Sequence, residues 1–264
     1  MRDWLNIAEG DAPLIVSVPH AGTAIPGEIT GLRSAVLARH DADFHVGQLY
    51  GFARNLGATI IETGISRSVI DVNRDPSGAS LYPGQATTSL CPETTFAGEP
   101  LYGDGQTPDT SEITRRRAVY FDPYHAALQA QIARLRAAHP AVVLYDAHSI
   151  RSHVPRLFAG ELPQFNIGSF GGASCALALT EAVARQCTGH SHVINGRFKG
   201  GWITRAYGNP AGGVHAIQME LAMRGYMDEA GDWPPVWNTA RAAALQPILH
   251  NILTACLSFA KDQT

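Results

Sequence analysis

The sequence contains few cysteines, and they are isolated from one another. Its 264 residues include four of them, and no two form a Cys-x-x-Cys pair: Cys91, Cys175, Cys187 and Cys256. This pattern excludes a disulfide-rich secreted scaffold and a cysteine-based zinc finger. The first ten residues also lack an apolar segment of signal-peptide length. We therefore expect free thiols in a reducing cytoplasm.

Charge of one sign and long apolar runs are scarce as well. Charged residues make up 16% of the chain, the formal net charge is −3, and the longest basic run is Arg115 to Arg117. Nucleic-acid binding needs a basic surface and a membrane span needs a long apolar stretch, so we expect neither partner. The 45% of hydrophobic residues suffices for a large core. This composition is typical of a soluble protein, and nothing in it sets an oligomeric state.

Apolar runs of strand length alternate with segments that have helical spacing. Strands are predicted at residues 13–19, 58–62, 141–151, 192–194 and 214–221, with residues 69–72 near the sheet. Helices are predicted at residues 32–56, 111–139, 175–187 and 237–260, the second with Ser111 as N-cap and a kink near Pro123. Loops are predicted at residues 75–108, 154–172 and 195–213. This order predicts one α/β domain over residues 1–264, in three layers, with a mixed, mostly parallel central sheet and helices on both faces.

Ionisable residues stand at the ends of three predicted strands. His20 follows the first strand, Asp146 and His148 end the apolar run of residues 141–145, and Glu220 lies near the end of the last. Functional groups of open α/β sheets collect beyond the carboxyl ends of strands, so these side chains are expected to converge. Two imidazoles on a divalent metal beside a carboxylate base suit metal-assisted hydrolysis. The alternative for each histidine is a local cap of a strand end.

A metal site of this kind needs a third protein ligand. The stretch HDADFH offers four candidates: His40, Asp41, Asp43 and His45. Charged residues on a helix are more often solvated than ligating, and the spacing alone leaves the choice open.

Two arginines flank a short apolar segment in SRSVIDVNR. They are Arg67 and Arg74, and Asn73 precedes the second. A guanidinium forms paired hydrogen bonds with a carboxylate, which makes these residues candidates for binding an acidic substrate. Exposed arginines at strand ends are the competing interpretation.

Seven motifs between residues 13 and 227 are specific in combination. They are SVPHAG, SRSVIDVNR, SLYPGQATTSLCP, PYHAAL, VVLYDAHSIRS, NGRFKGGWITRAYG and HAIQMEL. Together they resemble the N-formylglutamate amidohydrolase family, most closely its N-formylglutamate deformylase branch. That family is similar in plan to aspartoacylases and zinc carboxypeptidases, which implies a zinc-carboxypeptidase-like fold.

The resemblance implies an enzyme that hydrolyses N-formyl-L-glutamate to formate and L-glutamate in histidine degradation. It implies a divalent metal cofactor, with zinc as the first expectation, and the sequence does not separate zinc from cobalt, manganese or iron. By position, His20 and His148 match the metal histidines, and Glu220 matches the general base. The group that holds a substrate carboxylate matches Arg67, Asn73 and Arg74.

One departure from those relatives concerns the first histidine. It lies there in a His-x-x-Glu turn, whereas His20 is followed by Ala-Gly-Thr. The third ligand must come from elsewhere, and Asp43 is the choice made here. This makes a carboxypeptidase activity less favoured.

A substrate with two carboxylates needs at least two cationic groups. If the Arg67 and Arg74 group holds the α-carboxylate, the glycine-rich FKGGWITR stretch offers Lys199 or Arg205 for the side-chain carboxylate. For both cations, a solvated loop position is the competing interpretation.

Three other functions remain open at this point. A deacylase of a related N-acyl amino acid would use the same centre, and a carboxypeptidase-like enzyme would need an open groove. A non-catalytic amino-acid-binding module would keep the arginines but would not need His20, His148 and Glu220.

Overall fold

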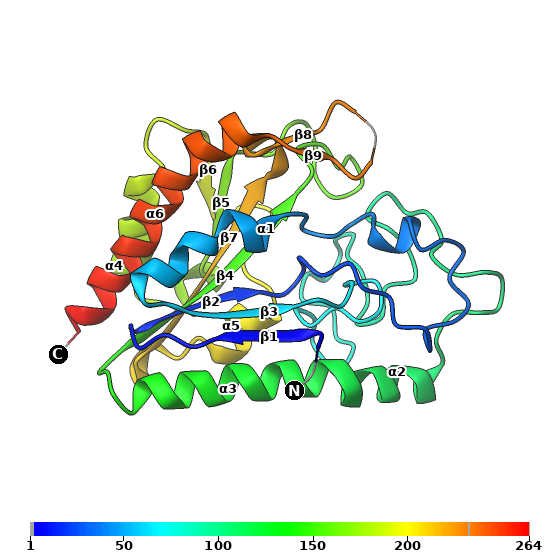
Figure 1. The fold of residues 1–264 in the computed structure, drawn as a ribbon, viewed down its shortest axis with the longest axis horizontal. Coiled ribbons are helices and arrows are strands. Elements are labelled where there is room, and N and C mark those ends of the chain that lie inside the picture. Colours follow the sequence, from blue (N-terminus) through cyan, green and yellow to red (C-terminus); the bar gives the residue numbers. More distant parts are fainter. Residues whose placement is uncertain (1–2, 232, 264) are drawn as a thin grey trace.

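The computed structural model describes residues 3–231 and 233–263, and its centre is a seven-stranded sheet (Figure 1). The strands are β1 (Leu5–Ala8), β2 (Leu14–Val18), β3 (Thr59–Thr63), β4 (Val142–Ile150), β5 (Phe165–Gly168), β6 (His192–Ile194) and β7 (Val214–Ala222). Their spatial order is β1-β3-β2-β4-β7-β5-β6. β3, β2, β4 and β7 run parallel, whereas β1 and β5 pair with this group antiparallel and β6 runs with β5. β8 (Met227–Asp228) and β9 (Val236–Trp237) form a separate antiparallel pair.

Helices cover both faces of this sheet. They are α1 (Val46–Leu49), α2 (Thr110–Arg116), α3 (Asp122–Arg136), α4 (Leu177–Gln186), α5 (Trp202–Tyr207) and α6 (Thr239–Lys261), with a π-helical turn (Arg117–Phe121) between α2 and α3. Single 3-10 segments occur at Leu37–Arg39, Gly51–Leu56, Phe170–Gly172, Pro210–Gly212 and Met223–Gly225. Figure 1 shows α3 along one face and α4 with α6 along the other. The expected α/β class, with three layers and a mixed, mostly parallel sheet, is confirmed.

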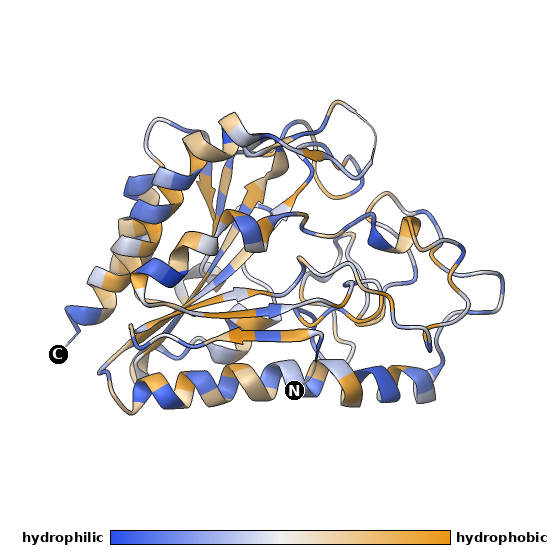
Figure 2. Cartoon of the chain, in the orientation of Figure 1, coloured by the Kyte–Doolittle hydropathy of each residue, from blue (hydrophilic) through white to orange (hydrophobic). Residues whose placement is uncertain are grey.

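The central strand β4 joins the two hydrophobic cores. Val143 and Tyr145 pack into the core formed with α4 and α6, while Val142 and Leu144 pack into the one formed with α3. This division follows from the alternation of side chains along a strand. Figure 2 shows the hydrophobic residues gathered on the strands and on the helix faces turned toward them.

Helix α6 corrects one expectation. Thr239–Lys261 is by length and composition apolar enough to cross a membrane, although no stretch of such length was expected. Residues such as Leu249 and Ile252 are fully buried and belong to the core cluster that also holds Val143 and Tyr145. A helix packed in this way belongs to the protein core.

Two helix predictions are wrong in detail. Residues 32–56 form only short helical pieces, because His45 has a φ of 62°, a left-handed conformation that no continuous helix can pass through. The N-cap of α2 is Asp109, whose side chain accepts a hydrogen bond from the Glu112 amide at 2.8 Å, and not Ser111. Pro123 lies in the first turn of α3, a position that tolerates proline, so the π turn takes the place of the expected break.

Besides the two-residue strands β8 and β9, three short elements were not predicted. β1 lies before the first expected strand, and β5 and α5 lie inside stretches read as loops. Each is four to six residues long, too short to show a period of its own. Residues 69–72 are buried beside the sheet without joining it, and residues 75–108 form the expected long loop.

Candidate active site

The sheet brings three of the predicted site residues together. His20 lies just beyond β2, and His148 and Glu220 are direct neighbours in the register of β4 and β7. The rings of His20 and His148 have centroids 4.8 Å apart, and both side chains are buried. Parallel strands placed side by side therefore produce the expected convergence.

Asp43 completes a cluster with the two histidines. Ligand atoms of His20, Asp43 and His148 all lie within 4.8 Å of one another. Asp43 Oδ2 lies 3.1 Å from His148 Nδ1 and 3.8 Å from His20 Nδ1. One carboxylate and two imidazole nitrogens form a donor set that suits zinc and several other divalent ions.

The opposite side of each ring is held by a carboxylate. His20 Nε2 lies 2.7 Å from Asp71 Oδ1, and His148 Nε2 lies 2.8 Å from Asp146 Oδ2. In the described part of the chain, His20 Nδ1 is buried without a hydrogen-bond partner. A ring whose second nitrogen is fixed by a carboxylate presents its first nitrogen to a metal. The residues present therefore fit a divalent ion.

The broken helix of residues 32–56 explains why Asp43 reaches this place. The Asp43 amide donates a hydrogen bond to the His20 carbonyl at 2.9 Å, and the turn at His45 directs the chain away again. The other three candidates lie elsewhere. Asp41 pairs with Arg151 at 3.4 Å, His40 lies against Trp233 and His45 lies against Trp237.

The buried charges change the proton affinities in the cluster. Burial opposes the charged form of His148, but the neighbouring Asp146 and Asp43 outweigh it and raise its pKa well above the usual value. Burial, together with Arg67, lowers the pKa of His20. The pKa of Asp71 is held well below its ordinary range because Arg67 outweighs the effect of burial. The surrounding charges thus favour the protonated form of His148 and the neutral form of His20.

Glu220 has a different environment from these carboxylates. Burial raises its pKa to about 8, although His148 and Arg67 act in the opposite direction. The Gln218 amide donates to Glu220 Oε2 at 3.3 Å, while Gln218 Oε1 accepts from the Gly201 amide at 2.7 Å. A carboxyl group with a pKa near neutrality can both take up and release a proton.

Arg67 and Asn73 lie at the site but are committed to protein partners. Arg67 Nη2 donates to Asp71 Oδ2 at 2.6 Å, and Nη1 lies 3.5 Å from Asp43 Oδ1. Asn73 Nδ2 donates to Asp146 Oδ2 at 2.9 Å, and Asn73 Oδ1 accepts from the Ile203 amide at 2.7 Å. Both side chains thus hold the carboxylates behind the histidines.

Arg74 is less fully paired. Its Nη2 donates to the Thr88 hydroxyl at 3.1 Å, and its Nε lies 3.6 Å from Asp71 Oδ2. Within the described residues, Nε is buried and has no hydrogen-bond partner. Burial lowers the pKa of this guanidinium, as expected for a cation whose charge is only partly balanced.

Family membership follows from comparison with known proteins. A sequence model of the N-formylglutamate amidohydrolase family matches residues 12–227. The chain belongs to the N-formylglutamate amidohydrolase family. The resemblance noted in the sequence is thereby confirmed.

Named relatives cover the whole length of this family member. Two curated proteins called N-formylglutamate deformylase, from Pseudomonas putida and Pseudomonas aeruginosa, are 44% and 43% identical over 100% of this chain and 99% of theirs. The crystal structure of N-formylglutamate amidohydrolase from Ralstonia eutropha JMP134 has the same fold, with a TM-score of 0.82, 23% identity and 99% coverage of both chains. The gene product Atu2144 from Agrobacterium tumefaciens is also similar in fold, with a TM-score of 0.72, 20% identity and coverage of 97% and 95%.

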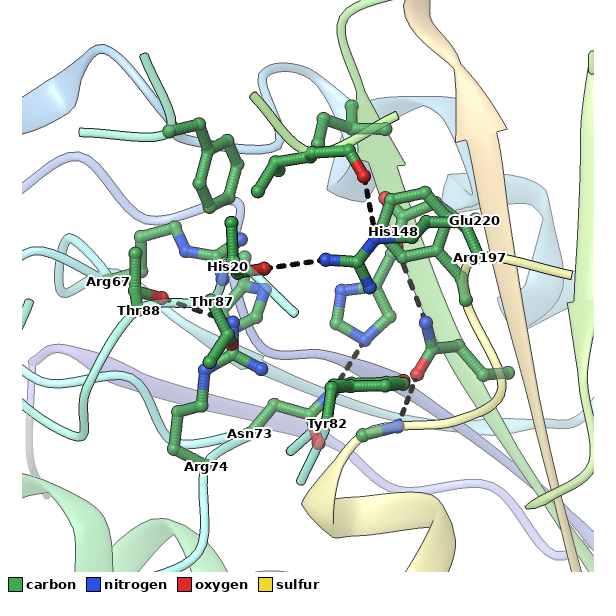
Figure 3. Close-up of a pocket in the computed structure, with 17 residues that line it drawn as sticks. His20, Arg67, Asn73, Arg74, Tyr82, Thr87, Thr88, His148, Arg197 and Glu220 are labelled. Atoms are coloured by element: carbon green, nitrogen blue, oxygen red, sulfur yellow. Dashed lines mark hydrogen bonds between the residues drawn. The ribbon is translucent and has the colours of Figure 1, made fainter. Parts of the chain in front are cut away.

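In this family member, a cavity opens in front of the histidines (Figure 3). The segments after β2 and β3, the long loop, β4, the segment after β6 and β7 all contribute to its lining. The lining side chains include His20, Arg67, Asn73, Arg74, Tyr82, Phe96, His148, Arg197, Gln218 and Glu220. Lys199 and Arg205 are not among the lining residues. Lys199 is exposed, and Arg205 donates to the backbone carbonyls of Gly200 and Leu81.

Arg197 lines the cavity and was not singled out from the sequence. It lies within the motif NGRFKGG, two residues before Lys199. Asp71 was missed as well, although it lies between the two arginines of SRSVIDVNR. A charged residue in the middle of an apolar strand-like run is the signal that could have revealed it.

Proposed function

We propose that this protein is a metal-dependent N-formylglutamate deformylase, which hydrolyses N-formyl-L-glutamate to formate and L-glutamate in histidine degradation. The observation that carries the proposal is the cluster of His20, Asp43 and His148 beside Glu220, on a cavity lined by arginines. Full-length relatives that bear this name, at 44% and 43% identity, support the choice of substrate. We also infer a cytoplasmic location, consistent with four free, buried cysteines.

His20, Asp43 and His148 are the residues that would hold the metal. A divalent ion such as zinc would supply a Lewis acid that polarises the formyl carbonyl and lowers the pKa of water. Asp71 and Asp146 keep the histidine rings oriented, through the contacts at 2.7 and 2.8 Å.

Glu220 would act as general base and then as general acid. It takes a proton from the water whose oxygen bonds to the formyl carbon, and later delivers that proton to the amine nitrogen as the carbon–nitrogen bond breaks. Gln218 keeps the carboxylate in place through its 3.3 Å hydrogen bond. The buried position that raises the pKa of Glu220 to about 8 makes its carboxylate a stronger base and so favours the uptake of the proton from water.

Arg74 is the residue best suited to hold the α-carboxylate of the substrate. It lies 3.6 Å from Asp71, the carboxylate that holds His20, and so is close to the reacting centre. Its unpaired buried Nε and its Nη groups offer charge-assisted hydrogen bonds.

The direct test is release of formate from N-formyl-L-glutamate by the purified protein. Activity is expected with the metal-loaded protein, is expected to disappear with a chelator, and is expected to return when zinc or another divalent ion is added. N-acetyl-L-aspartate and N-formyl-L-aspartate serve as comparison substrates. Faster release from either of these would favour the related deacylase, and absence of release from all three would leave a binding module.

A further inference from the structure

Two guanidinium groups on the cavity wall lack the close carboxylate partner that Arg67 has. Arg74 Nε lies 3.6 Å from Asp71 Oδ2, which is farther than the 2.6 Å between Arg67 Nη2 and the same oxygen. Among the residues that the structure describes, Arg197 has no carboxylate oxygen within 4.0 Å. A cavity with two incompletely balanced cations suits a ligand with two negative groups.

Arg197 is fixed by contacts that leave part of its guanidinium available. Nε donates to the Leu157 carbonyl at 2.8 Å, and Nη2 donates to the Ala86 carbonyl at 2.7 Å. The group also lies over the Tyr82 ring, 5.2 Å from its centroid. Only two of the five guanidinium N–H groups are used in these hydrogen bonds, and Nη1 takes part in neither.

The two arginines approach the cavity from different parts of the chain. Arg74 follows Asn73, which contacts Asp146 behind His148, whereas Arg197 lies on the segment after β6 and contacts none of the three metal-site residues. In Figure 3 the Arg74 side chain enters from the lower left of the view and the Arg197 side chain enters from the right. Arg74 therefore reaches the cavity beside the carboxylate that holds His20, and Arg197 reaches it from the segment after β6.

We propose that Arg197 binds the side-chain carboxylate of the substrate and selects N-formyl amino acids whose side chain ends in a negative charge. The inference deepens the proposed function and rests on it. In N-formyl-L-glutamate the α-carboxylate is attached to the carbon that bears the amide, and the second carboxylate lies three bonds further along the side chain. Arg74 is matched to the first group and Arg197 to the second.

Steady-state kinetics on N-formyl-L-glutamate and N-formyl-L-glutamine test this assignment, because the two substrates differ in one side-chain charge. We expect the wild-type enzyme to prefer the glutamate compound. In Arg197→Met, kcat/KM for the glutamate compound is expected to fall by about 10- to 100-fold, the value of a lost charge-assisted hydrogen bond. The glutamine compound is expected to lose far less, so the preference collapses. Arg197→Lys should retain part of it.

Arg205 provides the matched control. It also lies over the Tyr82 ring, at 4.9 Å, and donates to two backbone carbonyls, but it does not line the cavity. Arg205→Met therefore reports the loss of loop contacts alone, and we expect it to change both substrates by the same factor. Arg74→Met should also lower both, since both substrates keep the α-carboxylate.

If Arg197→Met loses the same factor of kcat/KM for both substrates, or loses none for either, the preference for the glutamate compound is unchanged and the assignment is overturned. A wild-type protein that cleaves neither compound would reject the proposed function instead. Calorimetric binding of the same two compounds to wild type and Arg197→Met then decides the inference separately. A wild-type preference for the glutamate compound that the variant loses supports it, and equal affinities in the wild type reject it.

Discussion

The two halves of β4 are equally buried but are stabilised in opposite ways. Residues Val142 to Tyr145 are fully buried among apolar side chains of both cores, while Asp146 to Ser149 are at most 2% exposed and mostly polar. The first half gains from removal of apolar surface from water. The second half can be buried only because each polar atom finds a partner. One strand therefore carries both the core and the site.

The polar half draws its partners from distant parts of the chain. Asp146 accepts hydrogen bonds from Ser17 at 2.8 Å and from Asn73 at 2.9 Å, and the Ser149 amide donates to Asp43 at 3.1 Å. Substitution of an apolar side chain in the first half costs packing energy. Substitution of a polar side chain in the second half disrupts a network of hydrogen bonds. Function should therefore respond to changes in the second half, and stability to changes in the first.

The largest effect is expected at Glu220, beside the polar half. Glu220→Gln should lower kcat by roughly two to four orders of magnitude, the usual contribution of a positioned acid–base group, with little loss of stability. Formate release and a thermal melt measure the two effects. Glu62→Gln, a carboxylate on β3 outside the cavity, is the control and should keep its activity. A kcat within a few-fold of wild type in Glu220→Gln would remove Glu220 from the mechanism.

Next in size is the loss of packing against the apolar half. Leu249 of α6 is fully buried in the core that holds Val143 and Tyr145. Leu249→Ala should lower the free energy of unfolding by about 2–5 kcal/mol while kcat of the folded protein stays unchanged, as chemical denaturation and kinetics can measure. Leu177→Ala, at a position 70% exposed, should change stability by less than about 0.5 kcal/mol. Loss of activity in still-folded Leu249→Ala would erase the contrast between the halves.

A smaller effect is expected behind the metal site. Asp146→Asn keeps the shape of the side chain but removes the charge that holds His148 Nε2 at 2.8 Å. The affinity for zinc should fall by about 10- to 100-fold, as measured by competition with a chelating dye. Leu249→Ala serves here as the control and should bind zinc as the wild type does. Equal affinities in both variants would mean that Asp146 has only a structural role.

The most gradual effect concerns a buried polar group on α3, outside the cavity. His125 of α3 has both ring nitrogens at 2.8 Å from partners, Tyr207 Oη and the Val72 carbonyl, and burial lowers its pKa to about 4. In the unfolded chain, His125 therefore becomes protonated below about pH 6.5, whereas in the folded chain it stays neutral down to about pH 4. Stability should fall with falling pH in this window, with a slope approaching about 1.4 kcal/mol per pH unit from this residue.

Denaturation curves between these pH values measure the slope. His125→Gln should flatten it, whatever its stability at neutral pH, while the exposed His192→Gln should leave it as in the wild type. A slope that is the same in all three proteins would assign the acid sensitivity to other groups.

Much of the fold was predictable because strong local patterns coincide with it. The runs that became β2 and the first half of β4 are mostly apolar, as buried parallel strands require, and the run that became β7 alternates apolar with polar residues. The failures have physical causes of their own. β5 is a four-residue strand held by β7 and β6, and the helical spacing of residues 32–56 is overridden where the chain turns at His45.

The prediction of the site divides in a similar way. His20, His148 and Glu220 could be predicted because a polar residue ending a buried strand is conspicuous in the sequence. The sequence could not show that Arg197, and not Lys199 or Arg205, lines the cavity. All three cations lie in one glycine-rich stretch, and which of them faces the cavity depends on the loops that pack against this stretch. The contacts of Arg197 with Leu157 and Ala86 involve residues 40 and 111 positions away.

By itself, the sequence determined the class of the sheet, the strand ends that carry ionisable groups and the family of the chain, since these depend on local order and on motifs. Only the tertiary structure decided that Asp43 joins the histidines, that Arg67 and Asn73 are committed to buried carboxylates, and that Arg197 faces the cavity. Those outcomes depend on distances between segments far apart in the chain, and on which charges balance one another once water is excluded.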